Sequence, residues 1–100
     1  MATITKLGKI TATEAEILGI LQEECAEVIV AISKINRFGW NSCHPDTPNF
    51  TNREHLTEEL GDLLAMVKIL CDKEIIDQNL LISAAEYKIT KLLKFSNIKP

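Results

Sequence analysis

Apolar residues recur every three or four positions along three stretches of the chain, separated by polar segments. This period places apolar side chains on one face of a helix, whereas a strand would alternate every second residue, and no stretch does so. The pattern predicts an all-α protein with helices over about residues 13–38, 52–73 and 77–95 and a loop over about residues 39–51. In the third helix the expected buried stripe comprises Leu81, Ile82, Ala85, Ile89, Leu92 and Leu93.

The predicted helix starts carry polar side chains that can accept hydrogen bonds from free backbone N–H groups. Thr13 followed by Glu16, and Thr51 followed by Glu54, have the spacing of a capping box. Asp77 is suited to cap the third helix. These capping signals agree with the starts that the apolar period predicts.

The segment between the first two predicted helices follows Gly39 and contains two prolines and several turn-forming residues. It is long for a compact helical domain, and loops of this length often carry function. Trp40 and Phe50 could stack on a base or simply close the end of a helical bundle, and His44 is a further candidate for stacking. Cys43 beside His44 lacks the ligand spacing of a zinc site.

The chain has 100 residues, of which 46% are hydrophobic. This is enough for one domain with an apolar core, over residues 1–100. A domain of this size buries only about two-thirds of its unfolded surface, so a second copy of the chain would complete its core. We therefore expect three main helices per chain and a bundle completed in a homodimer or tetramer.

The net charge of −3 argues against nucleic-acid binding, which requires excess lysine and arginine. Three cysteines, an odd number with no Cys-x-x-Cys pair, indicate free thiols in a reducing compartment. The first residues lack the apolar run of a signal peptide, and no run approaches a membrane span. We expect a cytoplasmic protein with neither a nucleic-acid nor a membrane partner.

Two helices carry acidic residues on the face where apolar residues are expected. At about 100° per residue, Glu24 falls inside the apolar stripe of the first helix, and Glu27 lies at its edge. Glu59 and Asp62 occupy the same kind of position in the second helix. Each pair has i, i+3 spacing, so both of its side chains project from one face.

Ionised carboxylates removed from water without partners cost several kcal/mol, and neighbouring ones repel. A divalent cation would offset this cost, because Mg²⁺ prefers hard oxygen ligands and is usually completed by substrate phosphates. The alternative is that the acids pair with basic side chains. The candidates are Lys34, Arg37, Lys68 and Lys73.

The segment Glu23-Glu24-Cys25-Ala26-Glu27, followed by Glu59-Leu60-Gly61-Asp62, resembles the ExxE…ExxD motif of the MazG-like all-α nucleoside triphosphate pyrophosphohydrolases. The resemblance spans the chain from about Glu14 to Phe95. It implies hydrolysis of a (deoxy)nucleoside triphosphate between the α and β phosphates, giving a monophosphate and pyrophosphate, in nucleotide-pool housecleaning or control. It also implies Mg²⁺ dependence, with Mn²⁺ as a possible substitute, and metal ligation by Glu24, Glu27, Glu59 and Asp62.

In this hypothesis Glu27 or Glu23 serves as general base for the attacking water. The residues expected to contact the substrate are Lys34, Arg37, Trp40, Lys88 and Lys91. Two alternatives remain open at the level of sequence. One is a non-catalytic helical dimerisation or adaptor module, and the other is a dimeric dUTP-type pyrophosphatase, which would share the acid pairs and differ in base recognition.

Overall fold

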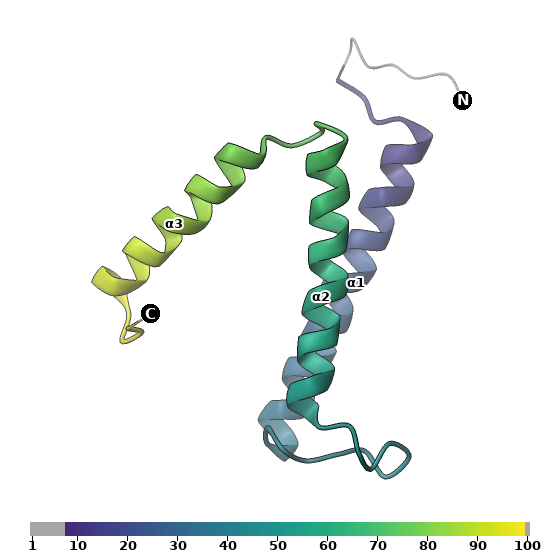
Figure 1. Ribbon diagram of the computed structural model, residues 1–100, viewed down its shortest axis with the longest axis vertical. Coiled ribbons are helices and arrows are strands. Elements are labelled where there is room, and N and C mark those ends of the chain that lie inside the picture. Colours follow the sequence, from purple (N-terminus) through teal and green to yellow (C-terminus); the bar gives the residue numbers. More distant parts are fainter. Residues whose placement is uncertain (1–7, 100) are drawn as a thin grey trace. The chain divides into compact units, whose positions relative to one another are not determined.

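The computed structural model describes residues 8–99 and contains three helices (Figure 1). These are α1 (Ala12–Phe38), α2 (Asn52–Asp72) and α3 (Gln78–Phe95). Outside them, the described residues form turns, and an isolated antiparallel bridge joins Cys43 to Thr51. The prediction of an all-α fold with three helices is confirmed.

Helix α1 begins earlier than its predicted cap. Its N-cap is Thr11, whose hydroxyl accepts a hydrogen bond from the Glu14 N–H at 3.0 Å, while the Thr11 N–H donates to Glu14 Oε1 at 2.8 Å. The expected capping box of Thr13 and Glu16 is therefore wrong. Both pairs have the same spacing, and the earlier pair gives a longer helix that includes Ala12, a strong helix former.

The other predicted helix ends are present. Glu54 Oε1 accepts hydrogen bonds from the N–H and the hydroxyl of Thr51 just before α2. The side chain of Asp77 accepts hydrogen bonds from two N–H groups in the first turn of α3. Gly39 ends α1 with a φ of 91°, a value that glycine adopts without the strain of a Cβ atom.

The chain divides into two compact units, Met1–Lys68 and Ile69–Pro100. In the first unit, α1 and α2 lie side by side and run in opposite directions (Figure 1). Buried and half-buried residues of α1 recur every three or four positions, and α2 has the same pattern. The side chains of Ile17, Ala31 and Met66 are buried in this unit, so the apolar period of each helix does mark a packed face.

The loop between α1 and α2 is tied together at its base. Asn52 Nδ2 donates a hydrogen bond to the Gly39 carbonyl at 3.0 Å, and the Arg53 N–H donates to the Trp40 carbonyl at 2.9 Å. The Arg53 guanidinium also lies 4.8 Å from the centre of the Trp40 ring. We call these contacts the loop clasp. They fix where α2 begins relative to the end of α1.

The second unit contains the end of α2 and helix α3. Leu70 is buried, whereas no residue of α3 is. The stripe predicted to be buried in α3 is therefore exposed in the single chain, except for the half-buried Leu92. An amphipathic helix buries its apolar stripe only where another surface covers it, and the second copy of the chain that the sequence led us to expect would be one such surface.

Within residues 8–99, none of the three helices is long and apolar enough to cross a bilayer.

Candidate metal centre

Two carboxylates lie in the packed faces of α1 and α2. On α1, the half-buried Glu24 stands between Leu21 and Val28, which are also half-buried. On α2, Glu59 is buried, with only 9% of its surface exposed. Charged residues are rarely buried without a partner. The departure from the apolar pattern that the sequence indicated is therefore present on both helices.

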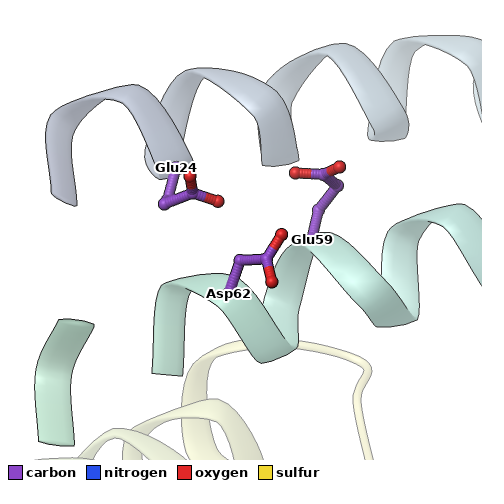
Figure 2. Close-up of side chains that lie close together, drawn as sticks. All are labelled: Glu24, Glu59 and Asp62. Carbon is purple, nitrogen blue, oxygen red and sulfur yellow. The ribbon is translucent and has the colours of Figure 1, made fainter. Parts of the chain in front are cut away.

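Glu24, Glu59 and Asp62 come together between the two helices. Each offers one carboxylate oxygen, and the three oxygens all lie within 4.8 Å of one another. Figure 2 shows Glu24 extending from α1 toward Glu59 and Asp62, which extend from α2 one turn apart. Asp62 is exposed, so the group is open to water on one side. We call these three residues the acidic cluster.

The environment of Glu24 is unfavourable for a carboxylate. Its Oε2 atom is buried and has no hydrogen-bond partner among the described residues. Loss of water around the carboxyl group, first, and then the nearby negative charges raise the pKa of Glu24. Those charges belong to Asp62, Glu59, Glu27 and Glu23, in decreasing order of effect. The folded chain alone thus disfavours the charged form of a residue at the centre of its packed face.

The acidic cluster has the donor set that a divalent cation requires. Carboxylate oxygens are hard ligands that suit Mg²⁺ and Mn²⁺, and cation binding would supply the positive charge that the buried Glu24 oxygen lacks. Within residues 8–99, this is the group of three or more acidic, histidine or cysteine side chains close enough to hold one ion. The residues present therefore fit a divalent metal.

The other two predicted acids of α1 lie close to the cluster but outside it. Glu23 and Glu27 are exposed, and both contribute to the negative field at Glu24. Their carboxylates are not among the three that gather within 4.8 Å. The structure thus brings together one acid of α1 with both acids of α2.

A cleft lies beside the cluster, where the loop meets both helices of the first unit. It has a volume of 270 Å³ and is lined by Lys34 of α1, by loop residues and by the first turns of α2. A second pocket of 410 Å³ shares Lys34, His44 and Asn52 with it. His55, which lines the first cleft, has its Nε2 atom 3.3 Å from Glu59 Oε1. The cleft and the cluster are therefore neighbours on α2.

The remaining residues predicted to bind substrate have varied surroundings. Lys34 lines the cleft. The Arg37 guanidinium lies 4.8 Å from the centre of the Phe38 ring, and Arg53 covers a face of Trp40. Lys88 and Lys91 belong to α3, in the second unit, where the ammonium group of Lys91 lies 4.9 Å from the centre of the Tyr87 ring. Of these, Lys34 is the cation placed in a cleft.

Sequence reasoning missed two residues of this region, His55 and Asn52. A signal for His55 existed, because it precedes Glu59 by four residues in a predicted helix and so shares its face. Asn52 gave none, since its contact with Gly39 depends on how the loop closes.

Residues 12–94 match the family model of the MazG nucleotide pyrophosphohydrolase domain. No curated protein and no solved structure matches the chain. The matched segment begins at the first residue of α1 and ends one residue before the end of α3, so it contains the whole acidic cluster. The activity associated with this domain is nucleotide pyrophosphohydrolysis.

Proposed function

Because this chain belongs to the MazG nucleotide pyrophosphohydrolase family, we propose that it hydrolyses a nucleoside triphosphate between the α and β phosphates, with Mg²⁺ as its metal. The products would be a nucleoside monophosphate and pyrophosphate. The observation that carries this proposal is the acidic cluster, where three carboxylates converge and a buried oxygen of Glu24 lacks a partner.

Glu24, Glu59 and Asp62 would hold the metal, with Glu27 as a further ligand from α1. The first three already lie close enough to share one ion. Glu27 is one helical turn beyond Glu24 and contributes to the negative field there. When bound, Mg²⁺ or Mn²⁺ supplies positive charge that stabilises the negative charge developing on the phosphates during hydrolysis.

Glu27 and Glu23 are the candidates for the general base. Both are exposed, so a water molecule can reach them, and both are close enough to Glu24 to affect its charge. Either carboxylate could accept the proton of the water that attacks the α phosphorus. Glu27 is also proposed as a metal ligand, whereas Glu23 is proposed as a general base alone.

Lys34 is proposed to neutralise phosphate charge from within the cleft, since it lies on α1 beyond Glu27 and lines that cleft. Arg37, one turn further along α1, is a second candidate from the same helix. Trp40, which is 48% exposed, is proposed to contact the nucleoside. Lys88 and Lys91 are proposed as cations that α3 supplies.

We further propose that residues 1–100 act as one domain that is completed by self-association in the cytoplasm. Large apolar side chains are exposed on every helix of the chain, including Ile29 at 67%, Leu64 at 65% and Leu80 at 68%. Exposed apolar surface of this extent is usually covered by a partner in solution. A second copy of the chain would supply that cover, as a homodimer or tetramer.

The decisive experiment is a pyrophosphate-release assay over standard and modified nucleoside triphosphates, with Mg²⁺ and with EDTA. We expect release with Mg²⁺ only. Glu24→Gln and Asp62→Asn should abolish it while remaining folded, and Glu16→Gln, an exposed acid of α1 outside the cluster, should retain it. A preference for dUTP would indicate the dUTP-type activity. A protein that neither binds Mg²⁺ nor releases pyrophosphate would contradict the proposal and favour an adaptor role.

A further inference from the structure

His55 lies between the cleft and the acidic cluster and contacts one of the cluster's carboxylates. Its Nε2 atom is 3.3 Å from Glu59 Oε1, across one turn of α2. Both side chains are largely shielded from water, with 26% of the His55 side chain and 11% of the Glu59 side chain exposed. This shielding distinguishes the contact from an exposed surface pair, which contributes little.

The surroundings of His55 hold its ring in place. Its backbone N–H donates a hydrogen bond to the Thr51 carbonyl at 2.9 Å, which anchors it in the first turn of α2. The Phe50 ring lies 5.9 Å from the imidazole, centre to centre, at a tilt of 52°. A tilted aromatic pair at this separation is a favourable arrangement. The imidazole therefore packs against the ring of loop residue Phe50, and its backbone is anchored in α2.

A glutamate side chain needs such support to act as a precise ligand. The torsion that turns its carboxylate is broad, so an unsupported carboxylate samples many orientations. The 3.3 Å separation allows a hydrogen bond from an imidazole Nε2–H to Glu59 Oε1, and such a bond restricts this rotation. Carboxylates that bind metals are commonly held by hydrogen bonds of this kind, and loss of the supporting group typically lowers metal affinity or activity about 10- to 100-fold.

We propose that His55 is a positioning residue that orients Glu59 for the divalent cation. This inference rests on the proposed function only in taking the acidic cluster as the metal site. It assigns His55 no contact with the reacting atoms. Its role is to hold the carboxylate of Glu59, with Phe50 holding the imidazole in turn.

The test is the affinity of the full chain for Mn²⁺, measured by electron paramagnetic resonance and calorimetry without nucleotide. Three variants are compared with the wild type: His55→Ala, which removes the donor, His55→Gln, whose amide can still donate to Glu59, and His44→Gln. The last is the matched control, because His44 also lines the cleft but its Nδ1 accepts a hydrogen bond from the Asp46 N–H.

We expect His55→Ala to weaken Mn²⁺ binding about 10- to 100-fold. His55→Gln should recover most of the affinity, and His44→Gln should bind as the wild type does. His55→Gln and His44→Gln should melt in EDTA near the wild-type temperature. If His55→Ala does not fold, His55→Gln compared with His55→Asn, whose shorter amide cannot span the same distance, still tests the donor.

The inference is overturned if His55→Ala binds Mn²⁺ with wild-type affinity, or if the wild type binds none. It is also overturned if the alanine and glutamine variants lose affinity equally along with thermal stability, since that marks a structural role. Pyrophosphate release separates this result from the proposed function. If the wild type hydrolyses triphosphates and His55→Ala keeps the wild-type Mn²⁺ affinity, only the role of His55 is refuted. Weakened Mn²⁺ binding in a chain without hydrolysis refutes only the proposed activity.

Discussion

The acidic cluster predicts that two substitutions change stability in opposite directions with and without metal. In EDTA, Glu24→Gln removes a charge from a carboxyl whose pKa is raised by lost hydration and by neighbouring acids. The neutral amide retains the shape of the side chain and can donate a hydrogen bond within the cluster. We therefore expect Glu24→Gln, and likewise Asp62→Asn, to have a higher melting temperature than the wild type when no divalent metal is present.

With metal the order should reverse. An ion that binds only the folded state stabilises it by about 2.7 kcal/mol at a concentration 100 times its dissociation constant. For a chain of this size each kcal/mol raises the melting temperature by roughly 4–8 °C, so saturation should raise that of the wild type by roughly 10–20 °C. The variants, with two of the three converging carboxylates left, should gain much less.

The assay is thermal unfolding followed by circular dichroism over a Mg²⁺ or Mn²⁺ titration, at one fixed chain concentration because self-association also stabilises. Glu16→Gln is the control, since it removes an exposed carboxylate of α1 at a distance from the cluster. It should follow the wild type at every metal concentration. The reasoning is refuted if Glu24→Gln is the less stable protein in EDTA, or if metal stabilises it as much as it stabilises the wild type.

Three further predictions concern the fold. Hydrogen bonds from the backbone N–H and the hydroxyl of Thr51 lower the pKa of Glu54. The stabilisation from this cap is therefore fully present at a pH above the ordinary glutamate pKa, and it is lost as the pH falls through the lowered pKa. Urea unfolding should accordingly show Glu54→Ala less stable than the wild type at neutral pH, with the difference vanishing in acid. Ile17 is only 7% exposed, so Ile17→Ala should lower the free energy of unfolding by about 2–5 kcal/mol in the same urea experiment. A decrease below about 1 kcal/mol would contradict the place of Ile17 in the core. Asn52→Ala removes the hydrogen bond to the Gly39 carbonyl and should cost about 1 kcal/mol, with faster amide exchange in the loop, whereas unchanged exchange would argue against the clasp.

The sequence was sufficient for the helices because their signals are local. The apolar period, the Thr51–Glu54 box and Asp77 all act within a few residues, and the helices lie where they predicted. The start of α1 was misplaced because Thr11 and Thr13 present the same spacing to a following glutamate. Local patterns alone do not choose between two such caps.

The candidate site, too, could be predicted only where its signals are local. Glu24 and Glu59 could be found because each interrupts an apolar period, and the fold places both in the packed faces. The cleft could not be found in this way, since it depends on how the loop closes between α1 and α2. The exposed stripe of α3 shows a further limit: a helical period identifies the apolar face of a helix but not the surface that covers it.

The loop clasp has a consequence for how this chain tolerates change. Because Asn52 and Arg53 fasten the end of α1 to the start of α2, the opposition of Glu24 and Glu59 does not depend on how many residues the intervening segment contains. Doubling the length of a flexible segment costs only about 0.6 kcal/mol. Peptides could therefore be grafted near Asp46, and foreign recognition elements displayed beside an undisturbed pair of helices.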